Sequence, residues 1–156
     1  MPRAGAAAAT VLIAALAVGA GWRALWAHGA GHAVSWRDAT AGLQEPLLTR
    51  PTARLFHRRA DLAAFLRRED DTRAPTLPAV DFSRDDAALI STGPRSSTGY
   101  SVRIVSVTAE RARLLVIAHE TTPSLGTQTI ARLTVPVRLL VLPKLGKPLS
   151  VRWEGR

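Results

Sequence analysis

Residues 87–107, AALISTGPRSSTGYSVRIVSV, contain a short apolar run, a loop of small and polar residues, and a second run with alternating character. In the second run Tyr100 and Ile104 share one face of an extended chain with the valine between them, while Ser101 and Arg103 point the other way. This alternation is typical of antiparallel strands with one buried and one solvated face. The stretch therefore predicts strands at Ala87–Ser91 and Tyr100–Val107.

Similar short runs continue through the chain, separated by turn sequences rich in Gly, Pro, Ser and Thr. Two of them, RLLVIAH (113–119) and VRLLVLP (137–143), are almost continuously apolar, which favours central strands. Pro136 has no N–H to donate, so we expect it at a strand break or an edge. Further strands are predicted at Thr52–Arg58, Thr129–Val135 and Leu149–Trp153, with a first short strand near Val34–Arg37.

A helix is expected directly after the predicted strand at Thr52–Arg58. In RADLAAFLRRED (59–70), Leu62, Phe65 and Leu66 stand at the i, i+3 and i+4 spacing of one helix face, and Asp61 caps the helix or lies in its first turn. The elements together predict a mainly β fold, an antiparallel β-sandwich or small barrel of six to eight strands with one short α-helix.

The amino-terminal region has the layout of an export signal or of a single membrane anchor. Residues 4–21 carry no charge and follow Arg3. Small residues ending at Ala20 suit cleavage by a signal peptidase, whereas Trp22 beside an arginine suits a membrane interface. Both alternatives stay open, and we favour a retained hydrophobic helix with the rest of the chain outside the cytoplasm. The predicted divisions are residues 1–22 (signal or anchor), 23–49 (linker with the first strand) and 50–156 (β-rich domain).

Composition excludes several classes of protein. The chain has no cysteine, which excludes disulfides, thiolate metal sites and a cysteine nucleophile. The formal net charge is +9, but the basic residues are scattered and aromatic residues are few, so nucleic acid is not an expected partner. A polyanion or an anionic lipid surface remains an alternative partner.

No motif in the sequence predicts an enzyme. There is no G-x-S-x-G turn, phosphate loop or paired-carboxylate motif. His57 and His119 lie at alternating strand positions, where a structural role is the commoner one. His28 and His32 are four residues apart, but the glycines between them disfavour the helix that a shared metal would need. We therefore predict no catalytic residue, no metal and no cofactor.

The order of the segments resembles the carboxyl-terminal domain of the PrcB family of protease complex subunits, over roughly residues 50–156. The resemblance rests on Val80–Phe82, on the loop from Gly93 to Tyr100, and on Pro136 and Pro143 around an apolar strand. It implies an exported, non-catalytic, β-rich domain with a protein partner, such as a secreted or membrane-associated protease. The loop departs from the family pattern, because it lacks the usual proline and the first of two paired glycines, and the lipid-attachment cysteine of some relatives is absent.

Two groups of residues follow from this comparison. Structural roles are expected for five positions: Asp81, Phe82, Gly93, Gly99 and Tyr100. We expect Asp81 to close a turn and Phe82 to lie in the core. We expect Gly99 to have a positive φ and Tyr100 to start the inward face of a strand. No structural role is expected for the rest of the loop, which is therefore the candidate partner-binding segment: Pro94, Arg95, Ser96, Ser97 and Thr98.

The predicted function is that of an exported, non-catalytic protein-binding or accessory domain. An alternative is a protease inhibitor that inserts residues 94–99 into its target, because Thr98, Gly99 and Tyr100 are also similar to a loop of chagasin-type inhibitors. A basic domain that binds a polyanion or an anionic lipid is the other alternative.

Overall fold

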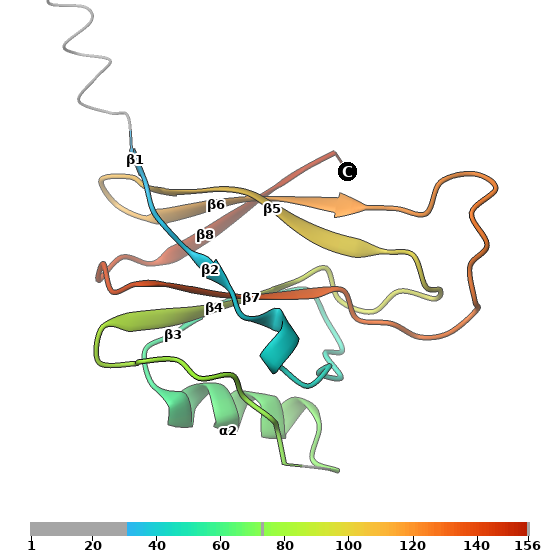
Figure 1. Ribbon diagram of the computed structural model, residues 1–156, viewed down its shortest axis with the longest axis horizontal. Coiled ribbons are helices and arrows are strands. Elements are labelled where there is room, and N and C mark those ends of the chain that lie inside the picture. Colours follow the sequence, from blue (N-terminus) through green and yellow to red (C-terminus); the bar gives the residue numbers. More distant parts are fainter. Residues whose placement is uncertain (1–30, 73, 156) are drawn as a thin grey trace, which may run out of the picture. The chain divides into compact units, whose positions relative to one another are not determined.

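The computed structural model describes residues 31–72 and 74–155. Within them, eight strands form two four-stranded sheets, and one α-helix, α2 (Arg59–Glu69), lies beside the second sheet (Figure 1). The first sheet has the order β1-β5-β6-β8, with bounds His32–Ala33, Ser101–Ala109, Leu114–Thr121 and Leu149–Glu154. The second has the order β2-β7-β4-β3, with bounds Arg37–Asp38, Val137–Pro143, Asp85–Ser91 and Thr52–Phe56. A 3₁₀ turn, η1 (Thr40–Gly42), follows β2.

The two sheets pack face to face, and α2 covers the outer face of the second sheet, which gives three layers (Figure 1). The central strands β4 and β7 are consequently buried on both faces. One set of their side chains packs against the first sheet: Ala88, Ile90, Leu140 and Leu142. The alternate set packs in the cluster that contains the helix: Ala87, Leu89, Leu139 and Val141. This explains the continuous apolar runs at residues 87–90 of β4 and 139–142 of β7, and it confirms the predicted central position of VRLLVLP.

The predicted helix is confirmed, with the predicted residues facing the core. Leu62, Phe65 and Leu66 are buried, and the Phe65 ring lies 5.5 Å from the ring of Phe56 on β3. Asp61 lies in the first turn, where its carboxylate accepts a 2.8 Å hydrogen bond from Arg58, and no side chain caps the helix. Burial of this apolar face holds the short helix, since an isolated helix of 11 residues is marginal in water.

Strand β5 contains a bulge that the alternation did not predict. Its register with β6 shifts between Ile104 and Ser106. Before the bulge Val102 is buried, and after it Val107 is buried, so the inward positions change from even to odd numbers. The side chain of Val105, at the shift, is exposed.

Four further expectations need correction. Residues 129–135 form no strand, only an isolated bridge at Thr134, because most of their side chains lie in solvent instead of on a sheet. The first short strand is split into β1 and β2, since the chain crosses from one sheet to the other between Val34 and Trp36. Strand β8 pairs with β6 in parallel, not antiparallel. In the part of the chain that the structure describes, the sheets do not close into a barrel.

The folded unit runs from His32 to Arg156. It therefore includes residues 32–49, which contribute β1, β2 and four buried hydrophobic residues of the core, Val34, Ala39, Leu43 and Leu48. The expected hydrophobic helix at residues 4–21 lies outside the described residues. Among residues 31–72 and 74–155, the helices are too short or too polar to cross a membrane.

Candidate partner-binding surface

Two long loops lie side by side at one end of the two sheets (Figure 1). The first loop (92–100) joins β4 to β5, and the second loop (122–136) joins β6 to β7. Arg95 and Thr134 exchange two backbone hydrogen bonds of 2.8 and 2.9 Å, and the N–H of Thr98 donates to the carbonyl of Ile130 at 3.0 Å. Side chains add to this, because Thr98 Oγ1 accepts from the Ile130 N–H and Thr134 Oγ1 donates to the Ser97 carbonyl. The first loop thus has a structural role that the sequence did not indicate, which is to support the second.

The side chain of Arg95 turns inward and is held by several partners. Its Nη2 lies 2.6 Å from Glu120 Oε1 on β6, and its Nη1 donates to the carbonyls of Thr92 and Pro94. The guanidinium carbon lies 5.8 Å from the centre of the Tyr100 ring. The hydrogen bond to Glu120 raises the pKa of Arg95 above its ordinary value, and burial opposes this. Arg95, predicted as part of the partner-binding segment, thus makes its contacts within the protein and is partly buried.

Two glycines of the first loop have positive φ, and Tyr100, which was predicted to begin a strand, lies just outside it. Gly99 has a φ of +96°, and a Cβ there would lie 3.1 Å from the ring of Pro123 in the second loop. Gly93 has a φ of +80°, and a Cβ there would lie 2.8 Å from the backbone nitrogen of Pro51. Tyr100 is half-buried directly before β5. In the first loop the most exposed side chain is that of Ser96.

The second loop displays the apolar side chains that sequence reasoning missed. Leu125, Ile130 and Leu133 have relative exposures of 106, 68 and 66%, larger than those of the other exposed large hydrophobic residues described. Together with the exposed Arg132, they form what we call the apolar loop surface. The signal in the sequence was large aliphatic residues isolated among Thr, Ser, Gly and Pro. The predicted strand at Thr129–Val135 assigned Ile130 and Leu133 to a sheet, so their exposure was not expected.

The Asp81–Phe82 motif is separate from the loops and is structural. It precedes β4, whereas the first loop follows β4, so the two lie at opposite ends of this strand. Asp81 Oδ1 accepts hydrogen bonds from the hydroxyl and the N–H of Ser83, which lower the pKa of Asp81. Phe82 packs, partly buried, against the core cluster beside α2. Asp81 therefore closes a turn, and Phe82 contributes to the packing beside α2.

Two of the three histidines of the folded region, His57 and His119, make structural contacts, whereas His32 is exposed in β1. His57 Nδ1 lies 2.9 Å from a carboxylate oxygen of Asp86, which is 1% exposed, and His119 Nδ1 lies 3.0 Å from the carbonyl oxygen of Glu154. No hydrogen bond joins either ring to a Ser or Thr hydroxyl in the described residues. Neither arrangement supplies an activated nucleophile.

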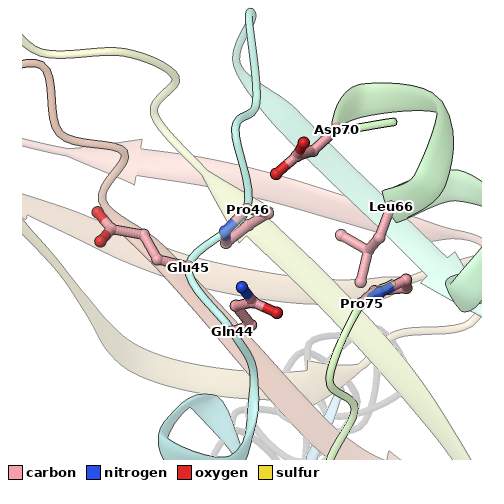
Figure 2. A pocket seen from close by; sticks show the side chains of 6 residues that line it. All are labelled: Gln44, Glu45, Pro46, Leu66, Asp70 and Pro75. Carbon is pink, nitrogen blue, oxygen red and sulfur yellow. The ribbon is translucent and has the colours of Figure 1, made fainter. Parts of the chain in front are cut away.

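A small hollow lies between the carboxyl end of α2 and the segment that follows η1 (Figure 2). Leu66 and Pro75 stand on one side of it and Pro46 and Glu45 on the other. Its volume of about 20 Å³ has room for about one water molecule. A ligand the size of a substrate does not fit there.

Comparison with known proteins gives one match. Residues 87–143 match a family model described as PrcB C-terminal. The match begins in β4 and ends in β7, so it contains both loops, and it confirms the resemblance over this part of the predicted range. No curated protein and no solved structure matches the chain.

Proposed function

Since both loops lie within a PrcB C-terminal segment, we propose that the protein is an exported, non-catalytic accessory domain that binds a protein of an extracytoplasmic protease complex. The contact is made by the apolar loop surface, with the first loop as its support. The observation that carries this proposal is the exposure of Leu125, Ile130 and Leu133 on a loop that is hydrogen-bonded to its neighbour.

Burial of this surface favours association for two reasons. Each of these aliphatic side chains gains about 1.5 to 3 kcal/mol when it moves from water into an apolar site. The loop is already fixed by the bonds at Thr98 and Thr134, so less conformational entropy is lost on binding than for a free loop. The second loop also carries no carboxylate that would oppose burial.

Export and the absence of catalysis rest on other observations. The uncharged segment at residues 4–21 supports export, with a retained anchor or with cleavage near Ala20. The contacts of His57 and His119 supply structural explanations for both rings, and neither ring is hydrogen-bonded to a Ser or Thr hydroxyl.

A photocrosslinking experiment in the producing cells tests the proposal. The full chain carries a benzophenone amino acid at Leu133 and, as a matched control, at Arg111, which is exposed in the hairpin between β5 and β6 at the other end of the first sheet. We expect Leu133 to yield a crosslink to a protease or to a subunit of a protease complex, identified by mass spectrometry, and Arg111 to yield none. Crosslinking to other proteins only, or equally from both positions, would contradict the proposal.

The two alternative functions give different results. An inhibitor slows a subtilisin-like or a papain-like protease in proportion to the amount of chain added, whereas an accessory domain that does not block the active site leaves both rates unchanged. A polyanion binder is retained on heparin and released as the salt concentration rises. The logarithm of its binding constant falls linearly with the logarithm of the salt concentration, and the number of charges neutralised sets the slope. Replacement of Leu125 and Leu133 by serine removes the proposed contact but leaves retention on heparin unchanged.

A further inference from the structure

A groove lies beside the apolar loop surface, between the second loop and the segment that follows η1. Six residues from these two segments line it: Gln44, Glu45, Leu47, Arg132, Leu133 and Val135. We call it the leucine groove, because Leu47 and Leu133 come from its two sides and are 45 and 66% exposed. The groove is therefore open to solvent, and through Leu133 it is continuous with the surface proposed for partner binding.

Both sides of the leucine groove are fixed. On one side, Leu133 lies between Ile130 and Thr134, whose main-chain groups are hydrogen-bonded to the first loop. On the other side, Leu48 is 1% exposed and anchors the chain directly beside Leu47. A partner consequently meets a groove that is formed before binding, so little conformational entropy is lost when it binds.

The size of the groove indicates the kind of occupant. Its volume is about 240 Å³, below the range of about 300 to 1,000 Å³ that is typical of small-molecule sites. A single large side chain of another protein needs less room, and such anchors in pockets supply much of the affinity of protein interfaces. The leucines on the two sides favour an apolar side chain. The groove thus suits one residue of a protein partner better than it suits a free ligand.

Glu45 adds a requirement for charge. It lines the leucine groove and also the adjoining hollow that reaches Tyr100 and Arg138, so a partner seated there covers it. Figure 2 shows its carboxylate directed away from Leu66 on α2. The side chain is exposed and forms no hydrogen bond or ion pair within the described residues. A partner that removes water from this carboxylate must supply a cation in exchange.

The chain itself does not supply this cation. Arg132 also lines the groove, but no ion pair joins it to Glu45 in the part of the chain that the structure describes. Arg138, in the adjoining hollow, already lies 3.6 Å from a carboxylate oxygen of Asp38. A second copy of the chain is disfavoured as the source, because the net charge of +9 opposes association of two copies. The cation is therefore expected from a different protein.

We propose that the leucine groove binds one large apolar side chain of the partner, and that Glu45 pairs with a lysine or arginine beside that side chain. The apolar group is buried between Leu47 and Leu133, and the basic group stays at the rim with the carboxylate. This inference rests on the function proposed above. It adds the chemistry of the partner segment that the accessory domain recognises, an apolar residue next to a basic one.

The test uses the full chain in the producing cells, with a benzophenone amino acid at Leu125 as the reporter. Leu125 belongs to the apolar loop surface but does not line the groove. Leu47→Ser should lower the yield of the crosslink to the partner at least about fivefold, because it removes one side of the groove. Val105→Ser is the matched control, since this valine is 44% exposed on β5, and it should leave the yield unchanged. Equal yields from the two variants would overturn the groove and leave the function proposed above standing.

Charge reversal at Glu45 gives a second measurement with the same reporter. Glu45→Lys should lower the yield at least about tenfold, because two like charges then meet in the interface. Glu110→Lys makes the same change of net charge in the hairpin between β5 and β6, at the other end of β5, where it breaks only a partly exposed pair with Arg113. This control should leave the yield unchanged. Effects of equal size would show that only net charge is sensed and would exclude the site at Glu45.

A benzophenone amino acid at Leu47 identifies the partner residues. We expect the crosslinked peptide, mapped by mass spectrometry, to contain a large apolar residue beside a lysine or arginine. Replacement of that basic residue by glutamate should restore the yield with the Glu45→Lys chain. A peptide without a basic residue, or a yield that is not restored, contradicts the proposal.

Two further outcomes separate the groove from the proposed function. Absence of a crosslink from Leu125, Leu133 and Leu47 contradicts the function and the groove together, whereas a crosslink from Leu125 or Leu133 with none from Leu47 contradicts the groove alone. A dimer in sedimentation equilibrium that Glu45→Lys dissociates would assign the groove to a second copy and overturn the proposal.

Discussion

Arg95 and Glu120 form an ion pair across the end of the two sheets, with 2.6 Å between Nη2 and Oε1. The side chain of Glu120 is 8% exposed and that of Arg95 23% exposed, so water screens this pair much less than a surface pair. The pair ties the first loop to β6, and the backbone bonds between Arg95 and Thr134 extend the connection to the second loop. Arg95 thus connects both loops to the first sheet, in addition to the bonds that Thr98 and Thr134 make between the loops.

Arg95→Ala is expected to lower the free energy of unfolding by about 1.5 to 3 kcal/mol, because it removes the charge-assisted hydrogen bond from Arg95 to the buried carboxylate of Glu120. Urea denaturation measures the change. Arg103→Ala is the control, since it removes an exposed arginine without an ion pair in the described residues and should cost no more than about 0.5 kcal/mol. Similar losses in the two variants would show that the inward contacts of Arg95 do not stabilise the fold.

Gly99→Ala should destabilise the protein more than Gly126→Ala. Both glycines have positive φ, +96° and +85°, where an alanine costs about 1 to 2 kcal/mol. At Gly99 the added Cβ also lies 3.1 Å from Pro123, whereas at Gly126 it meets no atom within 4 Å. Thermal unfolding of the two variants separates the cost of the backbone conformation from that of the contact. Equal costs would mean that Pro123 moves aside without loss.

Leu139→Ala and Leu140→Ala should each cost about 2 to 5 kcal/mol, although the two residues are adjacent on β7. Their side chains point to opposite faces, and both are fully buried, one towards α2 and the other towards the first sheet. In a strand with one solvated face, only one of the two changes would be costly. Val105→Ala, at an exposed position, serves as the control and should change stability by about 0.5 kcal/mol or less.

Ser83→Ala should raise the pKa of Asp81 towards its ordinary value, because it removes the hydroxyl that donates to Oδ1. With a lowered pKa in the folded protein, the carboxylate contributes stability at neutral pH that is lost as pH falls through that pKa. An NMR titration of the aspartate carboxyl carbons measures the pKa directly. Ser96→Ala, in the first loop, should leave it unchanged, and an unchanged value in the Ser83 variant would exclude the hydroxyl as the cause.

The helix and the central strands could be predicted from sequence because their signals are local. The spacing of Leu62, Phe65 and Leu66 is set by a single helix face, and this face is the buried one. The continuous apolar run in β7 reflects two buried faces, which is visible in the residues of the strand itself.

Pairing and curvature could not be predicted in the same way. The bulge at Val105 shifts the inward face by one residue, yet valine is an ordinary strand residue and carries no turn signal. The parallel pairing of β8 with β6 depends on where the chain re-enters the first sheet, which no residue of Leu149–Glu154 specifies. The second loop was predicted to be partly strand, because nothing in its composition shows that Ile130 and Leu133 lack a sheet to cover.

The candidate site was located only in part. The sequence indicated the first loop from its small and polar residues, but the role of Arg95 depends on Glu120, 25 positions later in the chain. A contact of this kind has no local pattern. The exposed surface that we propose for binding belongs instead to the neighbouring loop.

The strand order of the two sheets also determines when the fold can form during synthesis. The first sheet holds both the earliest strand, β1, and the latest, β8, and β4 receives its neighbour β7 only after β5 and β6 have been made. Until then β4 has only β3 beside it in the second sheet, and although α2 precedes β4 and covers one of its faces, the face with Ala88 and Ile90 lacks its packing partners from β7 and the first sheet. A nascent chain that ends before β7 therefore exposes apolar strand residues, and these become buried only once residues 137–143 have been made.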